Sequence, residues 1–373
     1  MSGGIRFELA TPADDAELRE LLARTPMPGR ISVSFRREPS FIDAAVVEGP
    51  FRQTIVARDS SDQRIVAVAS RSIRDRFVNG QPAPVGYLSG LRILPSHRNA
   101  TILARGYRFL RELHTDARTP LYETTIVESN RHAVSMLTSG RAGLPQYRPA
   151  GSYHTLSIPV ARHLRRDAST ARDLELRPAT ATDTDAIVEF LLQTGSCRQF
   201  FPRYAADDFF CDGGTFRALQ PSDILLAFRD GRLVGTLGAW NQSSFRQTVI
   251  ERYGGPLKWF RPLYNVREKI LGRPELPAPG GRFRCAMAAI PLVEGNDPDV
   301  FGELLRILPN AATVGQCDYI LLRLHETDPL LPIARPFSIT SFVTQLYHVY
   351  WNDGDTASNR LDDRVPYLEL GSL

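Results

Sequence analysis

A short turn between an apolar segment and an amphipathic helix carries the residues of this sequence best suited to bind an anion. The turn spans residues 95–101, and His97, Arg98 and Arg105 place cationic side chains around it. A helix start leaves backbone N–H groups without partners and carries the positive end of the helix dipole, so it binds phosphate readily. The turn is a candidate phosphate site, and an ordinary strand-to-helix turn on a basic surface is the alternative.

A strand and a helix must hold this turn in place. Residues 91–94 read Leu-Arg-Ile-Leu, which is typical of a strand, and Leu103, Tyr107 and Leu110 recur at helical spacing. We expect the strand to begin near residue 87 and the next strand to span residues 121–127.

Composition narrows the class of protein. A chain of 373 residues is long enough for two domains, and 43% apolar with 23% charged residues is typical of a folded soluble protein. No segment approaches the length of a membrane span, and the first residues lack the pattern of a signal peptide. We therefore expect a cytoplasmic protein with no membrane partner.

Charge and cysteine usage exclude further classes. The net charge of +4 is not concentrated in a basic tract, so no nucleic-acid partner is expected. The four cysteines are scattered without metal-ligand spacing, so we expect free thiols and no metal. Almost all cations are arginine, with Lys258 and Lys269 the only lysines, which suggests a GC-rich bacterial genome and suits phosphate contacts.

The same order of elements occurs twice along the chain. Residues 5–22 and residues 174–192 each read as a short strand, an Ala-Thr turn and an amphipathic helix. Residues 53–70 and residues 223–240 each read as a hairpin. Two copies of one fold explain this repetition better than a single large fold.

These residues resemble the GNAT superfamily of acyl-CoA-dependent N-acyltransferases, and the chain resembles a tandem GNAT protein. The resemblance implies an α/β (α+β) protein of two GNAT-like domains, each a mixed, mostly antiparallel sheet flanked by helices. We predict a first domain at 1–160, a linker at 161–173 and a degenerate second domain at 174–373.

The resemblance also implies an acyl-CoA site in the first domain, with acetyl-CoA as the simplest ligand. The family turn, Arg/Gln-x-x-Gly-x-Gly/Ala, begins here at Arg98 and places Thr101 and Leu103 where small residues are usual. Leu103 is expected to narrow the groove, and Thr101 offers a hydroxyl donor. The implied cofactor-binding residues are Leu91, Ile93, Arg98, Asn99, Ala100, Thr101, Ile102, Leu103 and Asn130.

The proton donor of the family is missing from its usual place. Asn130 opens an Asn-x-x-Ala motif, and seven residues later many members carry a tyrosine that protonates the leaving thiolate of CoA. Leu137 stands there and has no proton to give. The role is relocated, with Tyr147 or Tyr153 as candidates and Tyr147 preferred, or it is absent.

The general base is equally unusual. The strand before the turn contains Tyr87 but lacks the early glutamate of the family. Glu123 and Glu128 lie on or just after the following strand, and either could act as the base through a water. The candidate catalytic residues are thus Tyr87, Glu128 and Tyr147. The alternatives are a groove-lining aromatic for Tyr87, a dipole-stabilising charge for Glu128, and solvent as the base.

The second copy departs further from the family. Its turn carries Glu294, Asp297 and Asp299, whose charges repel phosphate, and we expect it not to bind CoA. Two aromatic-rich segments, 196–210 and 252–271, are candidates for an acceptor pocket or for plain core.

Two functions remain open for a chain with these motifs. The first is an N-acyltransferase that moves an acyl group from acyl-CoA directly to a small-molecule or peptide amine, since no cysteine lies near the motif to form an acyl-enzyme. The second is a non-catalytic acyl-CoA-binding or interaction protein that retains the fold. A homodimer is compatible with either function.

Overall fold

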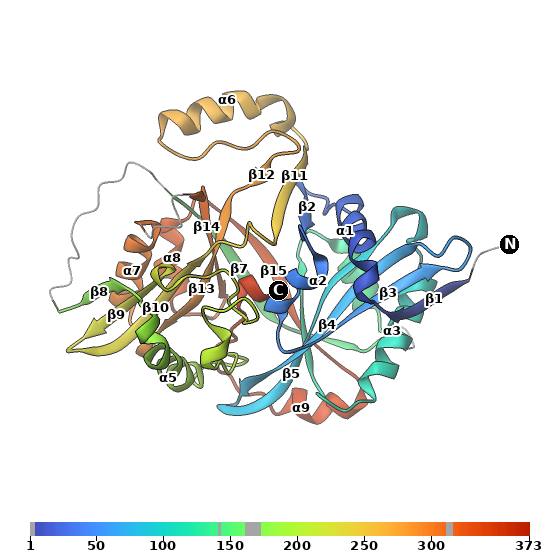
Figure 1. Cartoon of the computed structure of the whole chain (residues 1–373), viewed down its shortest axis with the longest axis horizontal. Helices are drawn as coiled ribbons and strands as arrows, with labels where there is room; N and C mark the ends of the chain where they lie inside the picture. The colour runs from blue at the N-terminus through green and yellow to red at the C-terminus, as the bar shows by residue number, and fades with distance from the viewer. Residues whose placement is uncertain (1–3, 141–142, 161–172, 311–315) are drawn as a thin grey trace.

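One large sheet runs through the molecule (Figure 1). The computed structural model of the chain describes residues 4–140, 143–160, 173–310 and 316–373. The sheet has twelve strands and is mixed but mostly antiparallel. From one edge to the other, the strands are β1 (Ile5–Leu9), β3 (Phe51–Asp59), β4 (Ile65–Val78), β5 (Gln81–Ile93), β6 (Tyr122–Val127), β15 (Thr340–Tyr350), β7 (Gln146–Pro159), β14 (Tyr319–His325), β13 (Cys285–Val293), β10 (Arg232–Trp240), β9 (Ile224–Arg229) and β8 (Glu175–Pro178).

The two halves of the chain exchange strands at the centre of this sheet. β15, from the end of the chain, lies between β6 and β7 and is antiparallel to both. β7, from the first half, pairs in turn with β14 of the second half. Paired strands therefore join the halves directly. The linker predicted at 161–173 lies outside the described residues except for Asp173.

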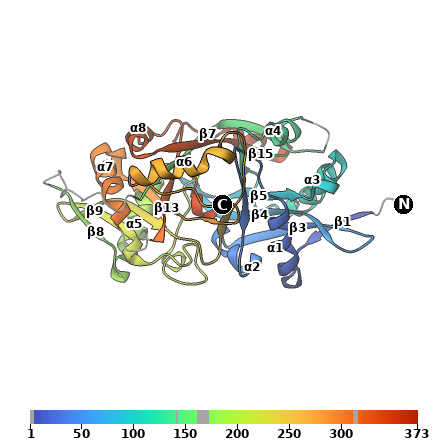
Figure 2. The same ribbon diagram turned by 90° about the horizontal axis from the view of Figure 1, so that it is seen from above.

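Helices cover both faces of the sheet, as Figure 2 shows. Successive side chains of a strand point to opposite faces of the sheet, so both faces receive apolar residues. Val56 and Val68 pack with α1 and α2 on one face. Ala57 and Ala67 pack with α3 on the other face. In the second half, α5 packs on one face and α7 and α8 on the other. The helices of the body are α1 (Asp15–Arg24), α2 (Phe41–Ala44), α3 (Ala100–His114), α4 (Arg131–Leu137), α5 (Thr184–Gly195), α7 (Pro298–Ile307), α8 (Leu331–Ala334) and α9 (Asp355–Asn359).

The structure confirms the mixed, mostly antiparallel sheet flanked by helices, together with both predicted hairpins, β3–β4 and β9–β10. The aromatic segment 196–210 belongs to the core: Phe200, Phe201, Tyr204 and Phe209 are buried. This segment therefore forms part of the hydrophobic core, which was one of the two alternatives predicted from the sequence.

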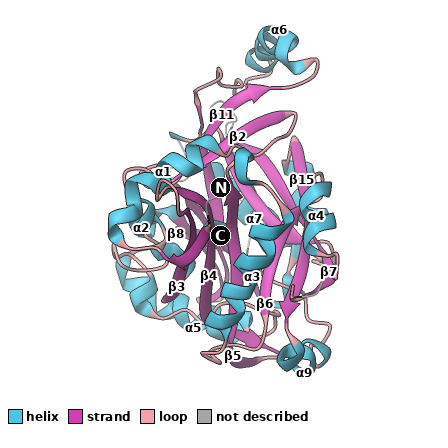
Figure 3. Cartoon of the chain, turned by 90° about the vertical axis from the view of Figure 1, so that its right-hand side faces the viewer, coloured by secondary structure: helices cyan, strands magenta, loops and turns pink. Residues whose placement is uncertain are grey.

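The second aromatic segment, 252–271, forms most of an arm that stands off the body (Figures 1 and 3). A small sheet of β2 (Ile31–Arg36), β11 (Gln247–Tyr253) and β12 (Arg282–Phe283) supports it, and α6 (Leu257–Ile270) lies at its end. The sequence did not predict β2 or this arm.

Within the described ranges, no helix combines the length and the apolar character that crossing a bilayer requires.

Candidate functional site

β5 and β6 are parallel neighbours in the first half, and they pair over only two positions. Gly86 lies opposite Tyr122, and Tyr87 lies opposite Glu123. Beyond these pairs the strands separate, while β5 continues to Ile93 with β4 still beside it. The separation leaves this part of β5 without a strand partner on its β6 side.

β5 also bulges within the separated part. Gly90 and Leu91 together oppose the single residue Ala69 of β4. Gly90 has a φ of 66°, a left-handed conformation that glycine adopts without steric cost. Because a bulge removes backbone groups from the ladder, it offers hydrogen-bonding groups where an extended ligand would enter.

The turn after β5 leads into α3, as the sequence predicted. Asn99 is the N-cap, and its side-chain oxygen accepts a hydrogen bond of 2.9 Å from the backbone N–H of Ile102. Arg98 is exposed, and its Nε donates to the backbone oxygen of Ile93 at 3.1 Å, which leaves the outer nitrogens of its guanidinium at the surface. His97 is held instead by Asp59, with 3.2 Å between Nε2 and Oδ2. Arg105, the other basic residue near the turn, donates to the backbone oxygen of Ile5. Arg98 is therefore the side chain placed to bind an anion.

The side chains of the first turn of α3 point to different surroundings. Leu103 is half-buried and packs against the apolar cluster between α3 and the sheet, and that it narrows the groove stays a prediction. Ile102 is buried in a neighbouring cluster, and Thr101 is exposed. The side chain of Ala100 lies outside the described part of the structure.

Arg92 lies within electrostatic range of two further arginines, Arg98 and Arg37. Burial, together with repulsion from Arg37 and Arg98, lowers the pKa of Arg92. Arg92 Nη1 donates to the neighbouring backbone oxygen of Leu91, at 2.9 Å. Among the described residues, the buried Arg37 Nη1 has no hydrogen-bond partner. Arg37 is itself paired with Glu48, so the repulsion that an anion would relieve is chiefly that between Arg92 and Arg98.

Asn130 lies at the end of β6, where it caps α4. Its side-chain oxygen accepts a 3.2 Å hydrogen bond from the backbone N–H of Ala133. Leu137, which stands in the place of the family tyrosine, is buried in the cluster under α3 and α4. The start of α4 is thus built as predicted, and it carries no proton donor at residue 137.

Tyr147 lies apart from the other predicted catalytic residues. Its hydroxyl is hydrogen-bonded to that of Tyr107 in the apolar cluster beneath α3. Burial and the neighbouring Tyr107 raise the pKa of Tyr147 well above its ordinary value. Tyr87 belongs to a different cluster, with Tyr153. The structure therefore does not bring Tyr147 together with Tyr87, and Glu128 is exposed beyond the end of β6.

A buried polar cluster surrounds Tyr87 instead. Glu123 is fully buried and paired with Arg76, with 2.7 Å between Oε2 and Nη1. Burial raises the pKa of Glu123 to about 7, and Arg76 acts in the opposite direction. The Tyr87 hydroxyl lies 2.9 Å from the Thr125 hydroxyl. A carboxylate with this pKa is suited to accept a proton near neutral pH.

The cluster contains several polar atoms without partners. Tyr153 interacts electrostatically with Glu123, Arg323, Arg76 and Tyr87, and burial raises its pKa well above the ordinary value. Four buried atoms of the cluster have no hydrogen-bond partner among the described residues, namely Glu123 Oε1, Arg76 Nε, Tyr153 Oη and Arg323 Nη1. Buried groups of this kind are rare in folded proteins and indicate a place where water or a ligand binds.

A small cavity of about 10 Å³ adjoins the cluster, which is room for about one water. Tyr87, Arg74 and Arg76 line it from the sheet, and residues near the end of the chain close it. Arg246 donates from one side to the backbone oxygens of Gly371 and Leu373. The end of the chain is thus packed against the polar cluster.

The second half also contains two parallel strands that separate next to a bulge, but different residues lie at the separation. β13 and β14 are parallel and pair only as far as Met287 and Leu321. The backbone N–H of Ile290, at a bulge in β13, donates to Glu369 Oε2 at 3.0 Å. The Glu369 side chain therefore occupies the backbone N–H at the β13 bulge, the position that corresponds to the bulge at Gly90 in β5.

The turn before α7 is also closed. The Asp297 carboxylate caps the helix by accepting from the backbone N–H groups of Asp299 and Val300, at 2.9 and 3.2 Å. Arg229 and Arg232 pair with Asp297 and Glu294. The helix amides that an anion would need already have a carboxylate partner.

The arrangement of strands and helices matches that of known structures. A GCN5-related N-acetyltransferase from Sphaerobacter thermophilus aligns with 99% of this chain over 98% of its own, at a TM-score of 0.57 and 12% identity. Saccharomyces cerevisiae N-myristoyltransferase with bound myristoyl-CoA aligns with 93% of this chain over 79% of its own, at a TM-score of 0.60 and 12% identity. This chain has the GNAT fold.

A third structure with this fold belongs to a larger protein. It is a GCN5-related glucosamine N-acetyltransferase region of a fungal multi-domain β-N-acetylglucosaminidase, with a TM-score of 0.60 and 13% identity. The alignment covers 93% of this chain and 38% of that one, so this chain spans well under half of that protein. No family model and no curated protein matches the sequence.

Within the GNAT fold, sequence reasoning found the turn and the strands but missed much of the buried cluster. The sequence pattern indicated Glu123 only as an alternative base, and the family motifs include neither Arg76 nor Arg323. One feature of the sequence pointed to them: Arg74 and Arg76 alternate along β4, a strand that is otherwise largely apolar. Side chains at every second position of a strand lie on the same face of the sheet, and buried charged side chains need hydrogen-bonding or ionic partners there.

Proposed function

We propose that the chain is an N-acyltransferase that takes its acyl group from acyl-CoA, most simply acetyl-CoA. The observation that carries this proposal is the parting of β5 and β6 directly before the cationic start of α3. An extended pantetheine arm fits beside the unpaired edge of β5, and the pyrophosphate fits at Arg98. Arg92 and Arg37 are the residues that would balance further phosphate charge.

Bound acyl-CoA would supply a thioester carbonyl at the point where the strands part. The amine nitrogen of the acceptor bonds to this carbonyl carbon, the carbon–sulfur bond breaks, and CoA leaves as a thiolate. The proton lost by the amine passes to Glu123, directly or through water, for which the cavity beside Tyr87 and Arg76 has room. A carboxyl group with a pKa of about 7 is about half ionised at neutral pH, and its ionised form can accept the proton.

A tyrosine hydroxyl returns a proton to the thiolate. Tyr153 is better placed for this than Tyr147, because its hydroxyl has no partner among the described residues and lies in the cluster with Glu123 and Tyr87. Tyr147 is engaged with Tyr107. Tyr87, fixed by Thr125, then positions the reacting groups.

The second half is proposed to be a degenerate copy that completes the acceptor side of the site. Glu369 at the β13 bulge and Asp297 at the start of α7 occupy the positions that a second CoA would need. The acceptor is proposed to be a small-molecule or peptide amine that reaches the cluster between the two halves.

A non-catalytic acyl-CoA-binding protein is the second candidate. Glu123 is fully buried and the adjoining cavity holds about one water, so an acceptor amine reaches the carboxylate only if the covering segments move. A protein that only binds acyl-CoA would not need this movement.

A thiol-release assay tests the proposal. Purified protein with acetyl-CoA and a panel of amines and peptides should release CoA thiol at a rate that depends on the amine. The Glu123→Gln variant is the matched control, since it should bind acetyl-CoA with unchanged affinity and release thiol at least ~10²-fold more slowly. If the protein binds acetyl-CoA but releases no CoA thiol with any amine or peptide of the panel, the binding protein is favoured. Absence of binding would overturn both candidates.

A further inference from the structure

Half of the large apolar side chains that are exposed among the described residues lie on α6. Trp259, Leu263, Val266 and Ile270 recur at i, i+4, i+7 and i+11 and form one stripe along the helix. Their exposed fractions are 75, 66, 55 and 80%. Soluble proteins rarely leave such a stripe uncovered, because each side chain gains free energy by leaving water.

The opposite side of the same helix is fixed to the arm. Leu257, Arg261, Tyr264 and Glu268 form a second stripe, shifted by two residues and therefore by about 200°. Leu257 and Tyr264 pack in a small core with the strands of the arm. The apolar stripe thus faces away from the arm.

Hydrogen bonds hold this orientation. The side chain of Asn265 both donates to and accepts from the backbone of Leu276, at 3.0 and 2.9 Å, and Arg261 donates to the same backbone oxygen at 3.0 Å. α6 lies at the end of the arm, away from the body (Figures 1 and 3), so a flat surface can reach its outer face.

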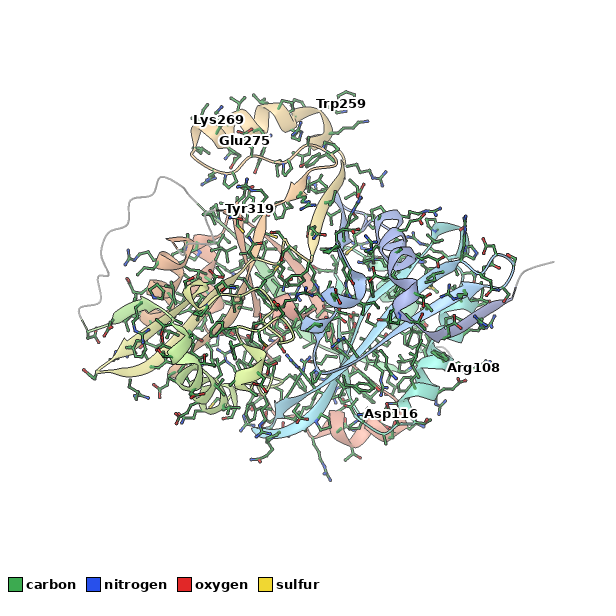
Figure 4. All side chains as sticks on the ribbon, viewed as in Figure 1. Arg108, Asp116, Trp259, Lys269, Glu275 and Tyr319 are labelled. Carbon is green, nitrogen blue, oxygen red and sulfur yellow. The ribbon has the colours of Figure 1, made fainter. Side chains whose placement is uncertain are left out.

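Cations predominate around the stripe, where the exposed acidic residue is Glu275, next to Lys269 in Figure 4. Lys258 and Lys269, the only lysines of the chain, are exposed on α6, and Arg267 and Arg273 are exposed beside them. Glu268 is the only acidic residue of the helix and it is buried. An exposed apolar stripe bordered by cations is the pattern of a helix that lies in the interface of an anionic bilayer.

We propose that α6 docks on an anionic lipid surface, with its apolar stripe among the acyl chains and its cations at the headgroups. A second copy of this chain fits less well, because pairing two such faces would bring like charges together. The sequence alone predicted no membrane partner because it has no spanning segment. A helix in the interface needs none.

Trp259 makes this proposal directly measurable. Of the three tryptophans, Trp240 and Trp351 are buried, so a change in emission reports on Trp259. The full chain is mixed with vesicles of phosphatidylcholine alone or of phosphatidylcholine with phosphatidylglycerol. We expect a blue shift and co-sedimentation with the anionic vesicles only, both weakened by salt.

Paired variants separate the two contributions. Leu263→Ser with Ile270→Ser keeps Trp259 and should abolish the blue shift, and both side chains are exposed enough that folding should not suffer. Lys258→Gln with Lys269→Gln should weaken vesicle binding about 25-fold, about fivefold for each cation. The control is Arg108→Gln on α3, which lies far from Trp259 and Lys269 (Figure 4) and should change nothing.

Two outcomes would overturn the proposal. One is the absence of binding to anionic vesicles by the wild-type chain. The other is a concentration-dependent dimer, detected by sedimentation without lipid, that shifts Trp259 emission and is lost in Leu263→Ser with Ile270→Ser. That result would assign the face to a second copy of the chain.

Discussion

Tyr87 and Glu123 lie side by side as the last pair of the β5–β6 ladder, at the point where the two strands part. One carboxylate oxygen of Glu123 is 2.7 Å from Arg76 Nη1, and the other has no hydrogen-bond partner among the described residues. Burial raises the pKa of this carboxyl to about 7. A group able to exchange a proton near neutral pH therefore lies at the opening where acyl-CoA is proposed to bind.

Replacing this carboxylate should slow the reaction and change its pH dependence. A base acts only when deprotonated, so kcat/KM of the wild type should rise with pH and level off above about 7. Glu123→Gln should reduce kcat by ~10²-fold or more and remove this limb of the profile. Steady-state rates with a weakly basic amine, between about pH 5 and 9, measure both effects.

Glu128→Gln is the matched control for this measurement. Glu128 is exposed beyond the end of β6, and its loss should leave kcat and the profile unchanged. The assignment to Glu123 fails if Glu123→Gln keeps the wild-type profile, and it moves to Glu128 if that variant loses the limb instead.

Glu123 also predicts how stability depends on pH. Its pKa in the folded chain, about 7, is above its ordinary value of 4.5, so the folded state holds the proton more tightly than the unfolded state. This contribution to stability is fully present below about pH 4.5 and is lost as pH rises toward 7. Relative to Glu123→Gln, the wild type should lose up to about 1.4 kcal/mol of unfolding free energy per pH unit across this window.

Urea denaturation of the wild type and of Glu123→Gln at several pH values gives the difference in unfolding free energy. Because all other titrating groups are the same in the two proteins, their contributions cancel in this difference. A difference that is flat across the window would mean that Glu123 keeps its ordinary pKa. It would remove the physical basis for its role as base.

The sequence was sufficient for the parts of the fold that local patterns determine. The hairpins β3–β4 and β9–β10 follow from alternation and turn residues, and the start of α3 follows from Asn99 before an amphipathic run. The exchange of β15 and β7 depends on pairing between residues about 200 apart, such as His348 with Arg148, which no local pattern encodes.

The site was predictable to a similar extent. Arg98 and Asn130 were found because their motifs are continuous in the sequence, and both lie at helix starts as expected. The cluster of Arg76, Glu123 and Tyr153 was not found because its members come from three strands that the sheet brings together. Tyr147 was preferred for being close to Asn130 along the chain, but it packs against Tyr107.

Arg98 provides a direct test of the cofactor site. Arg98→Ala should weaken CoA binding by about 1.5–3 kcal/mol, because it removes a charge-assisted hydrogen bond to phosphate. Arg111→Ala, at an exposed position near the other end of α3, should have little effect. Calorimetric titration of CoA into each variant measures the change, and equal losses would show that general basicity attracts the ligand.

Substitution of Tyr153 and of Tyr147 shows which of the two tyrosines is the proton donor. Tyr153→Phe should lower turnover by ~10²-fold with CoA affinity intact, since its unpartnered hydroxyl lies in the cluster with Glu123. Tyr147→Phe should leave turnover nearly unchanged but cost about 1–3 kcal/mol of unfolding free energy, because it leaves the buried Tyr107 hydroxyl unpaired. Rates and urea denaturation of both variants decide the matter, and a loss of turnover confined to Tyr147→Phe would reverse the assignment.

The two halves should differ in CoA binding, and the stoichiometry tests this. Gly90 leaves the β5 bulge open, whereas the matching bulge in β13 has its Ile290 N–H bonded to Glu369, and Asp297 caps the helix that follows. Calorimetric titration with CoA should therefore give one site per chain, which Arg98→Ala weakens and Arg229→Ala leaves unchanged. A stoichiometry near two would show that Glu369 and Asp297 yield to the ligand and that the second half also binds CoA.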